Sequence, residues 1–291
     1  MSPQLTGEII LKARERAKEQ GFSLGIGLTT NGSIYDERLS EIMVTNDVYL
    51  GVSFEVLKDI QEEQRQNYDK VVKVVRQYMD DGVDIMVKSI ITPKNVSRLN
   101  DMVKQLHILF PKVKKYKLQI VEDPVIFSNR DVMRNFYLQF SKYFFDAQKT
   151  GFDLGIDVYV LASKYIDMLI EHYCGGEMCL NPEGTITVCH RFSSPKEKQY
   201  QDIVYGRVTE EGEVLFDDEK FRKLISHDIK MQTKCQECFV KWHCGGGCLA
   251  QSMIYASDQL DIICEWTRRF TQEILERQVA AAKRQEANGK N

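Results

Sequence analysis

Apolar positions along the first 125 residues follow two alternating periods. Residues 48–55 place an apolar side chain at every second position, the period of a strand with one buried face. Residues 68–82 repeat apolar residues at helical spacing and end at Gly82, as an amphipathic helix does. By the same reading we expect further strands over 24–30, 83–92 and 115–122, and further helices over 36–44 and 95–110. This alternation predicts an α/β fold whose strands form a parallel sheet joined by crossover helices.

The predicted sheet is incomplete. Four strands are too few to close a (β/α) barrel, which needs about eight. The chain also begins on a helix, with Ser2 as its N-cap and Pro3 in its first turn, where an earlier strand would normally precede it. We therefore interpret residues 1–125 as the C-terminal half of a partial (β/α) barrel. Its unpaired edge predicts self-association, unless a partner supplies the missing strands.

The remainder of the chain divides into three segments. Residues 126–173 have helical spacing and form a predicted helical bridge, whose aromatic stripe we assign to the core rather than to base stacking. The stripe consists of Phe136, Tyr137, Phe140, Tyr143 and Phe144. Residues 174–270 are rich in cysteines and turns. Residues 271–291 are expected to form a C-terminal helix that fades into a polar tail.

Composition and charge narrow the classes of function. With 39 basic and 42 acidic residues, the chain has no general field to attract nucleic acid or an anionic membrane. No apolar run approaches the roughly 20 residues of a membrane-spanning helix. Charges interrupt the first 20 residues, so no signal peptide is expected. We expect a cytoplasmic protein with no nucleic-acid or membrane partner.

All eight cysteines lie within one segment of about ninety residues. They are Cys174, Cys179, Cys189, Cys235, Cys238, Cys244, Cys248 and Cys264. Disulfides suit small secreted chains, whereas clustered thiols in a reducing compartment more often bind metal. Thiolates are soft ligands for zinc, copper(I) or iron–sulfur clusters, and eight of them make two four-thiolate sites. Glycines between the cysteines ease the backbone where it wraps such a site.

The cysteine spacing resembles the SPASM domain, found at the C-terminal end of many radical S-adenosylmethionine (SAM) enzymes that modify peptides and proteins. The matching pattern is Cys174-x9-Gly184-x4-Cys189, then Cys235-x2-Cys238-x5-Cys244-x3-Cys248, then Cys264. The resemblance implies two auxiliary [4Fe–4S] clusters with interlocking ligands. Cys235, Cys238, Cys244 and Cys264 would hold the second cluster, and Cys248 would turn back to join Cys174 and Cys189 at the first. Cys179 would be the fourth ligand of the first cluster, or else a buried free thiol beside an open iron.

A weaker resemblance to the radical-SAM barrel covers the upstream strands. Thr30, Asn31 and Gly32 match a "TNG" turn that lines the cofactor site in relatives, and Ser53 with Glu55 matches a Ser-x-Asp pair. Arg65 lies where relatives place an arginine near the methionine carboxylate of the cofactor, a pairing that guanidinium geometry favours. The alternative is a simple strand-ending turn at residues 30–32 and a solvated charge at Arg65.

His190 follows Cys189 where anaerobic sulfatase maturases, a SPASM subgroup, usually carry a catalytic aspartate. The difference argues against that subgroup and favours a resemblance to enzymes that mature ribosomally made peptides. We expect His190 to donate a hydrogen bond to cluster sulfur. His243, beside Cys244, is expected to be exposed or to play a similar supporting role.

The Cys-x3-Cys-x2-Cys loop that holds the SAM-cleaving cluster in this family does not occur in these residues. We therefore expect a truncated or internally started form, with SAM used only by a full-length enzyme. The expected partners are a peptide or protein substrate and an electron donor such as ferredoxin or flavodoxin. Two alternatives stay open: a non-catalytic module that binds a peptide or a partner, and a structural protein with two zinc sites.

Overall fold

The structure is a computed structural model that describes residues 2–226 and 232–288. Two compact units share the chain. Unit 1 consists of Met1–Val121 and Leu138–Leu161, and unit 2 of Glu122–Tyr137 and Ala162–Asn291. The chain therefore leaves unit 1, returns to it within helix α6 (Arg130–Asp153), and then completes unit 2.

Unit 1 is built on a five-stranded, fully parallel sheet in which the strands follow their order in the sequence. The strands are β1 (Ile26–Thr30), β2 (Val48–Ser53), β3 (Ile85–Ile91), β4 (Lys115–Ile120) and β5 (Asp157–Tyr159). The four predicted strands are confirmed. The fifth corrects the expectation of helix throughout the bridge, because residues 157–159 pair with β4. Three residues are too few to show a strand period, so the sequence pattern could not reveal β5.

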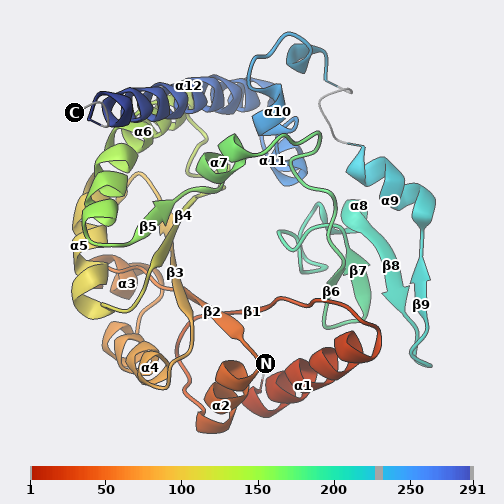
Figure 1. The fold of residues 1–291 in the computed structure, drawn as a ribbon. Helices are drawn as coiled ribbons and strands as arrows, with labels where there is room; N and C mark the ends of the chain where they lie inside the picture. Colours follow the sequence, from red (N-terminus) through yellow and green to blue (C-terminus); the bar gives the residue numbers. More distant parts are fainter. Residues whose placement is uncertain (1, 227–231, 289–291) are drawn as a thin grey trace. The chain divides into compact units, whose positions relative to one another are not determined.

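Helices cover one face of this sheet (Figure 1). They are α1 (Pro3–Glu19), α2 (Glu37–Thr45), α3 (Lys58–Gln64), α4 (Tyr68–Asp80), the short η1 (Val96–Arg98), α5 (Leu99–Leu109) and the second part of α6. The predicted helices at 36–44, 68–82 and 95–110 are confirmed, whereas α3 was not predicted. Ser2 caps α1 as expected, since its side chain accepts a hydrogen bond from the N–H of Leu5.

Alternation along β3 shows which face of the sheet forms the core. Ile85, Val87, Ser89 and Ile91 are almost fully buried, whereas Met86, Lys88 and Ile90 are only partly covered. The aromatic stripe of α6 is also core, as predicted: of its five members only Tyr143 is partly exposed, with Phe136 and Tyr137 belonging to unit 2 and the other three to unit 1. Burial of this apolar surface is the main stabilising contribution to the unit.

Unit 2 contains a four-stranded antiparallel sheet and short helices. The strands are β6 (Cys179–Leu180), β7 (Thr185–Thr187), β8 (Val204–Val208) and β9 (Val214–Phe216). The short helices are α7 (Leu161–Lys164), which starts at the end of unit 1, η2 (Tyr165–Asp167), α8 (Tyr200–Ile203), α9 (Asp218–Ile225), η3 (Thr233–Cys235), α10 (Lys241–Cys244) and α11 (Leu249–Ile254). A core that includes Ile186, Phe192 and Ile203 packs β7 against α8 and α11.

The last helix, α12 (Ser257–Asn288), extends through most of the segment predicted to be helix and tail. Residues 289–291 of that tail lie outside the described residues. Among the described residues, no helix is both long and apolar enough to cross a membrane.

Candidate metal centres and cofactor site

Four of the cysteines come together in unit 2 from three elements. Cys235 ends η3, Cys238 follows it, Cys244 ends α10, and Cys264 lies in α12. All four are partly buried. Burial, followed by the charges of the other three sulfurs, raises the pKa of the Cys244 thiol to about 11. Because the other three sulfurs all influence the pKa of Cys244, the four cysteines lie close together. We call them the Cys244 group.

A glycine allows the chain to turn directly after Cys244. Gly245 has φ of +60°, in the left-handed region that glycine tolerates and other residues rarely adopt. A Cβ at this position would lie 2.4 Å from the backbone nitrogen of Tyr173. The Tyr173 N–H donates to the Gly245 carbonyl at 2.9 Å, so two distant segments touch here through their backbones.

The remaining four cysteines form a second neighbourhood, the Cys248 group. Cys179 begins β6, Cys189 lies two residues beyond β7, and Cys248 is the N-cap of α11. Burial raises the pKa of Cys248 to about 11, and the charges of Glu122 and Cys189 add to the rise. Cys174 contributes to the raised pKa of both Cys179 and Cys189. Cys248 thus faces the earlier cysteines, although it is only four residues from Cys244 in sequence.

All eight thiols are free, so no disulfide uses them. Two separate groups of four soft donors fit two four-thiolate metal centres in their chemistry. Burial raises the pKa of five of these thiols, namely Cys179, Cys189, Cys235, Cys244 and Cys248, and so favours their protonated form. Metal binding would therefore release protons.

In the structure the partner of His190 is a carboxylate, and the expected hydrogen bond to cluster sulfur stays a prediction. Nδ1 of His190 lies 2.7 Å from Oε2 of Glu177, and the His190 side chain is 79% exposed. The Cys179 thiol donates to the same carboxylate oxygen at 3.3 Å. Glu177, Cys179 and His190 place three potential metal-ligating atoms within 4.8 Å of one another. Sequence reasoning missed Glu177, although its position two residues before Cys179 places both on one face of an extended chain.

His243 is positioned by backbone rather than by sulfur. Its Nδ1 lies 3.1 Å from the carbonyl oxygen of Met168. The bond joins α10 to the residue that follows η2, so His243 anchors the short helix that carries Cys244.

In unit 1, the predicted cofactor residues lie at the carboxyl ends of β1 and β2, where ligands of parallel α/β sheets usually bind. Thr30 ends β1, and its Oγ1 accepts the N–H of Gly32 at 3.1 Å. The Asn31 carboxamide oxygen accepts the N–H of Ser33 at 3.1 Å. Gly32 has φ of +68°. These bonds form a tight turn at the end of β1. The turn explains why Thr30, Asn31 and Gly32 occur here even if they bind no ligand.

The pair Glu55 and Arg65 is less easily explained without a ligand. Oε1 of Glu55 accepts from Nε of Arg65 at 3.2 Å and from the N–H of Ile90 at 3.1 Å. Oε2 is buried and has no hydrogen-bond partner among the described residues. Burial raises the pKa of Glu55, and the contacts with Ile90 and Arg65 oppose the rise. Arg65 is therefore not a simple solvated charge. The unpartnered oxygen could accept a hydrogen bond from a bound cofactor, two residues beyond Ser53 at the end of β2.

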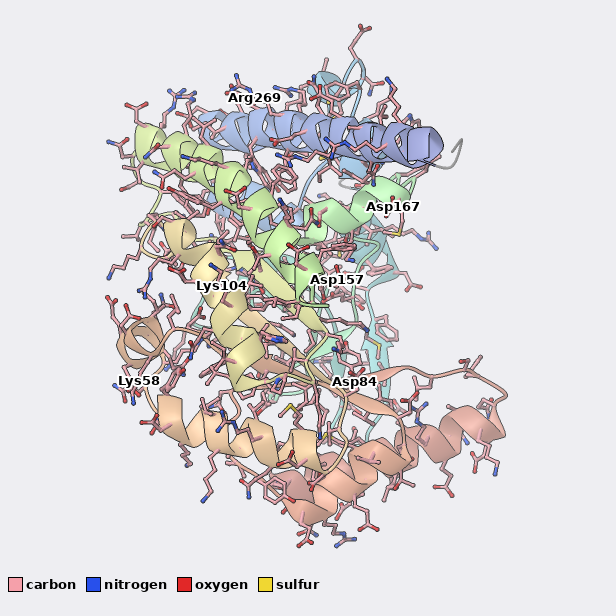
Figure 2. All side chains as sticks on the ribbon, turned by 60° about the vertical axis from the view of Figure 1, so that its left-hand side comes forward. Lys58, Asp84, Lys104, Asp157, Asp167 and Arg269 are labelled. Carbon is pink, nitrogen blue, oxygen red and sulfur yellow. The ribbon has the colours of Figure 1, made fainter. Side chains whose placement is uncertain are left out.

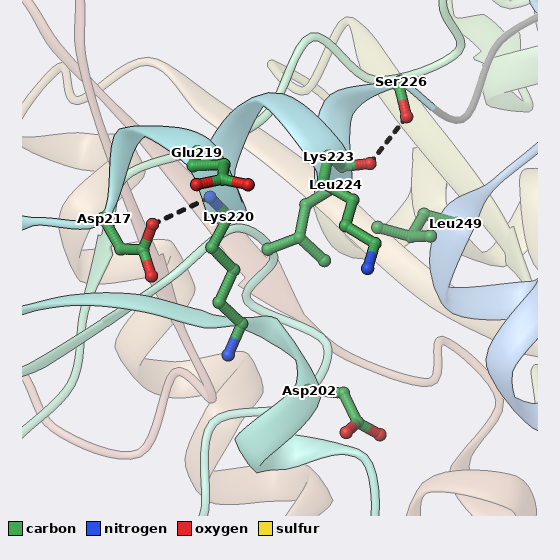
Figure 3. Close-up of a pocket in the computed structure, with 8 residues that line it drawn as sticks. All are labelled: Asp202, Asp217, Glu219, Lys220, Lys223, Leu224, Ser226 and Leu249. Atoms are coloured by element: carbon green, nitrogen blue, oxygen red, sulfur yellow. Dashed lines mark hydrogen bonds between the residues drawn. The ribbon is translucent and has the colours of Figure 1, made fainter.

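A surface depression of about 640 Å³ lies elsewhere in unit 2, around α9 (Figure 3). Its lining is mostly charged and of mixed sign, and it includes Asp217, Lys220 and Lys223. The Asp217 carboxylate accepts the N–H of Lys220 as the N-cap of α9. None of the residues predicted from sequence lines this depression, although Leu249 of its lining directly follows Cys248.

Comparison with known proteins gives one sequence relative and several structural neighbours. No protein-family model matches the chain. The chain is 22% identical to the cysteine-type anaerobic sulfatase-maturating enzyme of Clostridium perfringens over 280 residues, which cover 84% of this chain and 71% of the relative. This relative belongs to the subgroup against which His190 argued, so that argument does not exclude a relation to it.

Solved structures of anSMEcpe share the fold. Native anSMEcpe with bound AdoMet matches with a TM-score of 0.74 at 16% identity, covering 94% of this chain and 79% of that chain. The same protein with AdoMet and the Kp18Cys peptide matches with a TM-score of 0.72 at 14% identity, covering 95% and 81%. Streptococcus suis SuiB bound to precursor peptide SuiA matches with a TM-score of 0.55 at 14% identity, covering 80% and 56%.

These comparisons confirm the resemblance to radical-SAM enzymes with a SPASM domain, of the peptide- and protein-maturase type. They also confirm the predicted fold class, an α/β structure with a parallel sheet of the radical-SAM kind.

Proposed function

We propose that this chain, a radical-SAM maturase by resemblance and fold, binds two auxiliary [4Fe–4S] clusters that serve in substrate binding or electron transfer. One observation carries the proposal. The eight thiols separate into the Cys244 group and the Cys248 group: Cys189 acts on Cys248, whereas Cys235, Cys238 and Cys264 act on Cys244. A run of four structural cysteines from one loop would have no need for such a division.

The Cys244 group would hold the second cluster through Cys235, Cys238, Cys244 and Cys264. Cys174, Cys189 and Cys248 would hold the first cluster, with Cys179 as the fourth ligand. Iron–sulfur clusters supply one-electron chemistry and, where an iron is open, a site for substrate. The hydrogen bond from Cys179 to Glu177 would be exchanged for the metal bond.

SAM belongs to the same proposal, through residues of unit 1. Glu55, with its unpartnered Oε2, and Arg65 would contact the cofactor at the carboxyl ends of the strands, beside Ser53. Thr30, Asn31 and Gly32 would line the site through their turn. The Cys-x3-Cys-x2-Cys loop does not occur in residues 1–291. We therefore expect these residues alone not to cleave SAM, and truncation of a longer enzyme stays a prediction.

A peptide or protein substrate follows from the neighbours, which were solved with the Kp18Cys peptide and with SuiA. The electron donor, such as ferredoxin or flavodoxin, and a cytoplasmic location are also part of the proposal. A non-catalytic binding module would use the same clusters. A structural protein with two zinc sites would use the same thiols.

Metal analysis tests the proposal directly. The chain is expressed and purified without oxygen, and its iron, acid-labile sulfide and zinc are measured. About eight irons with equal sulfide per chain support two four-iron clusters. About two zincs without sulfide would overturn the cluster proposal and favour the structural alternative. Incubation with SAM and a reductant, followed by measurement of 5′-deoxyadenosine, then separates a catalytic chain from a binding module.

A further inference from the structure

Two lysines lie side by side on the face of the unit 1 sheet that the helices leave uncovered. Lys88 of β3 and Lys117 of β4 are direct partners in the parallel register. Side chains of such partners point to the same face, one strand spacing apart. Burial lowers the pKa of Lys88, and the charge of Lys117 lowers it further.

Within the described part of the chain, the group that solvates the ammonium of Lys88 is a neutral hydroxyl. Nζ of Lys88 donates to Oγ1 of Thr29 at 2.8 Å. Among the residues that the structure describes, no carboxylate forms an ion pair with Lys88 or with Lys117. A partly desolvated ammonium beside a like charge is costly, and an anion in contact with both would remove that cost.

The neighbouring strand makes room for this arrangement. The side chain of Lys88 passes over β2 at Gly51, where an added Cβ would lie 2.8 Å from Cε of Lys88. A side chain at position 51 would displace the lysine from Thr29. The absence of a side chain at Gly51 thus lets Lys88 reach across β2 to β1.

Aromatic side chains adjoin the lysines on the same face. Tyr159 of β5 is the register partner of Lys117, and its hydroxyl lies 2.9 Å from Sδ of Met86. Tyr49 of β2 lies two residues before Gly51, which places both on the same face of the strand, and it remains 47% exposed. The face therefore combines two cations with partly apolar surface, which suits an aliphatic side chain that ends in a carboxylate.

We propose that Lys88 and Lys117 together bind a carboxylate of the peptide substrate. The register also pairs Lys88 with Ser53, so the bound group would lie next to the predicted cofactor residues. Only the identification of the anion with a peptide carboxylate rests on the proposed function. The lysine pair itself is a feature of unit 1 alone.

The test uses the full chain and a terminally blocked peptide with two glutamates, together with a twin in which both are glutamines. Affinities are measured by calorimetry at low salt, because screening weakens such contacts. We expect Lys88→Met and Lys117→Met each to lower the affinity for the glutamate peptide at least tenfold. Binding of the glutamine twin should be weak and equal in all proteins. Lys88→Arg keeps the charge and should retain most of the affinity.

Lys104→Met is the matched control, since Lys104 is an exposed lysine on α5, outside this face (Figure 2). Circular dichroism confirms that each variant is folded. Equal affinity of the wild type and both lysine variants would overturn the proposal, as would an equal loss in Lys104→Met. The titration needs no cluster, so a failure of the cluster proposal would be seen in metal analysis and would leave this result readable.

Discussion

Arg65 forms an ion pair with Glu55, whose carboxylate is completely buried: Nε lies 3.2 Å from Oε1. The arginine is 31% exposed and keeps access to water, whereas the carboxylate has none. The two partners are therefore not equivalent. Removing the arginine would leave a buried charge without its counter-ion, while removing the charge of Glu55 would leave an arginine that water can solvate.

We expect Arg65→Met to lower the free energy of unfolding by about 3 kcal/mol near neutral pH, and Glu55→Gln to lower it by clearly less. Urea denaturation of both variants tests the order. The reverse order, or equal losses, would contradict the assignment of Glu55 as the buried partner.

The burial of Glu55 should also affect how the stability of the protein depends on pH. Burial raises the pKa of Glu55 in the folded protein, so the folded state binds this proton more readily than the unfolded state. The contribution of Glu55 to stability is then greatest below its unfolded pKa and falls as the pH rises through the folded pKa. Glu55→Gln should show a smaller decline with rising pH over this range, measured by thermal unfolding. An unchanged pH profile would contradict the raised pKa.

The division of the thiols predicts selective cluster loss. Cys248→Ser should remove the first cluster, and Cys244→Ser the second. Each should lower iron by about four per chain and leave a different electron paramagnetic resonance signal. Ser226→Ala, a surface change in α9's cap within the same unit, should keep both clusters. Loss of the same signal in both cysteine variants would show that the two thiols share one centre.

Gly245 should be intolerant of a side chain. Gly245→Ala adds both backbone strain at φ of +60° and a clash with Tyr173, so we expect a loss of more than about 2 kcal/mol and reduced iron loading. Gly212→Ala is the control, because φ is +84° there but nothing lies within 4 Å of the added Cβ. It should cost only about 1 kcal/mol. Similar losses in the two variants would argue against the close backbone contact at Tyr173.

Glu177 should suppress ionisation of Cys179 in the metal-free chain. Burial, with the hydrogen bond and charge of Glu177, raises the pKa of this thiol to about 12. Glu177→Gln removes the negative charge, so the pKa of Cys179 should fall. Alkylation of Cys179 at a given pH should then be faster, as followed by mass spectrometry of the peptide. An unchanged alkylation rate would mean that burial alone sets this pKa.

Local patterns in the sequence determined much of the secondary structure of unit 1. The alternation in residues 48–55 revealed β2, and helical spacing revealed α4, because burial of one face leaves a period in the chain itself. Cysteine type and spacing likewise predict soft-metal chemistry, which stays a prediction. The three residues of β5 were missed, since so short a strand has no period and depends on pairing with β4 for its conformation.

The tertiary structure decided which groups meet. Cys248 lies four residues from Cys244 but faces Cys189, because the chain turns at Gly245 and α11 then starts in a new direction. The hydrogen bond between His190 and Glu177 and the pairing of Lys88 with Lys117 likewise join residues that no local period relates. The spacing of apolar residues in the sequence shows which face of each segment is buried. Contacts between distant segments depend on how the backbone closes, so only the folded chain shows them.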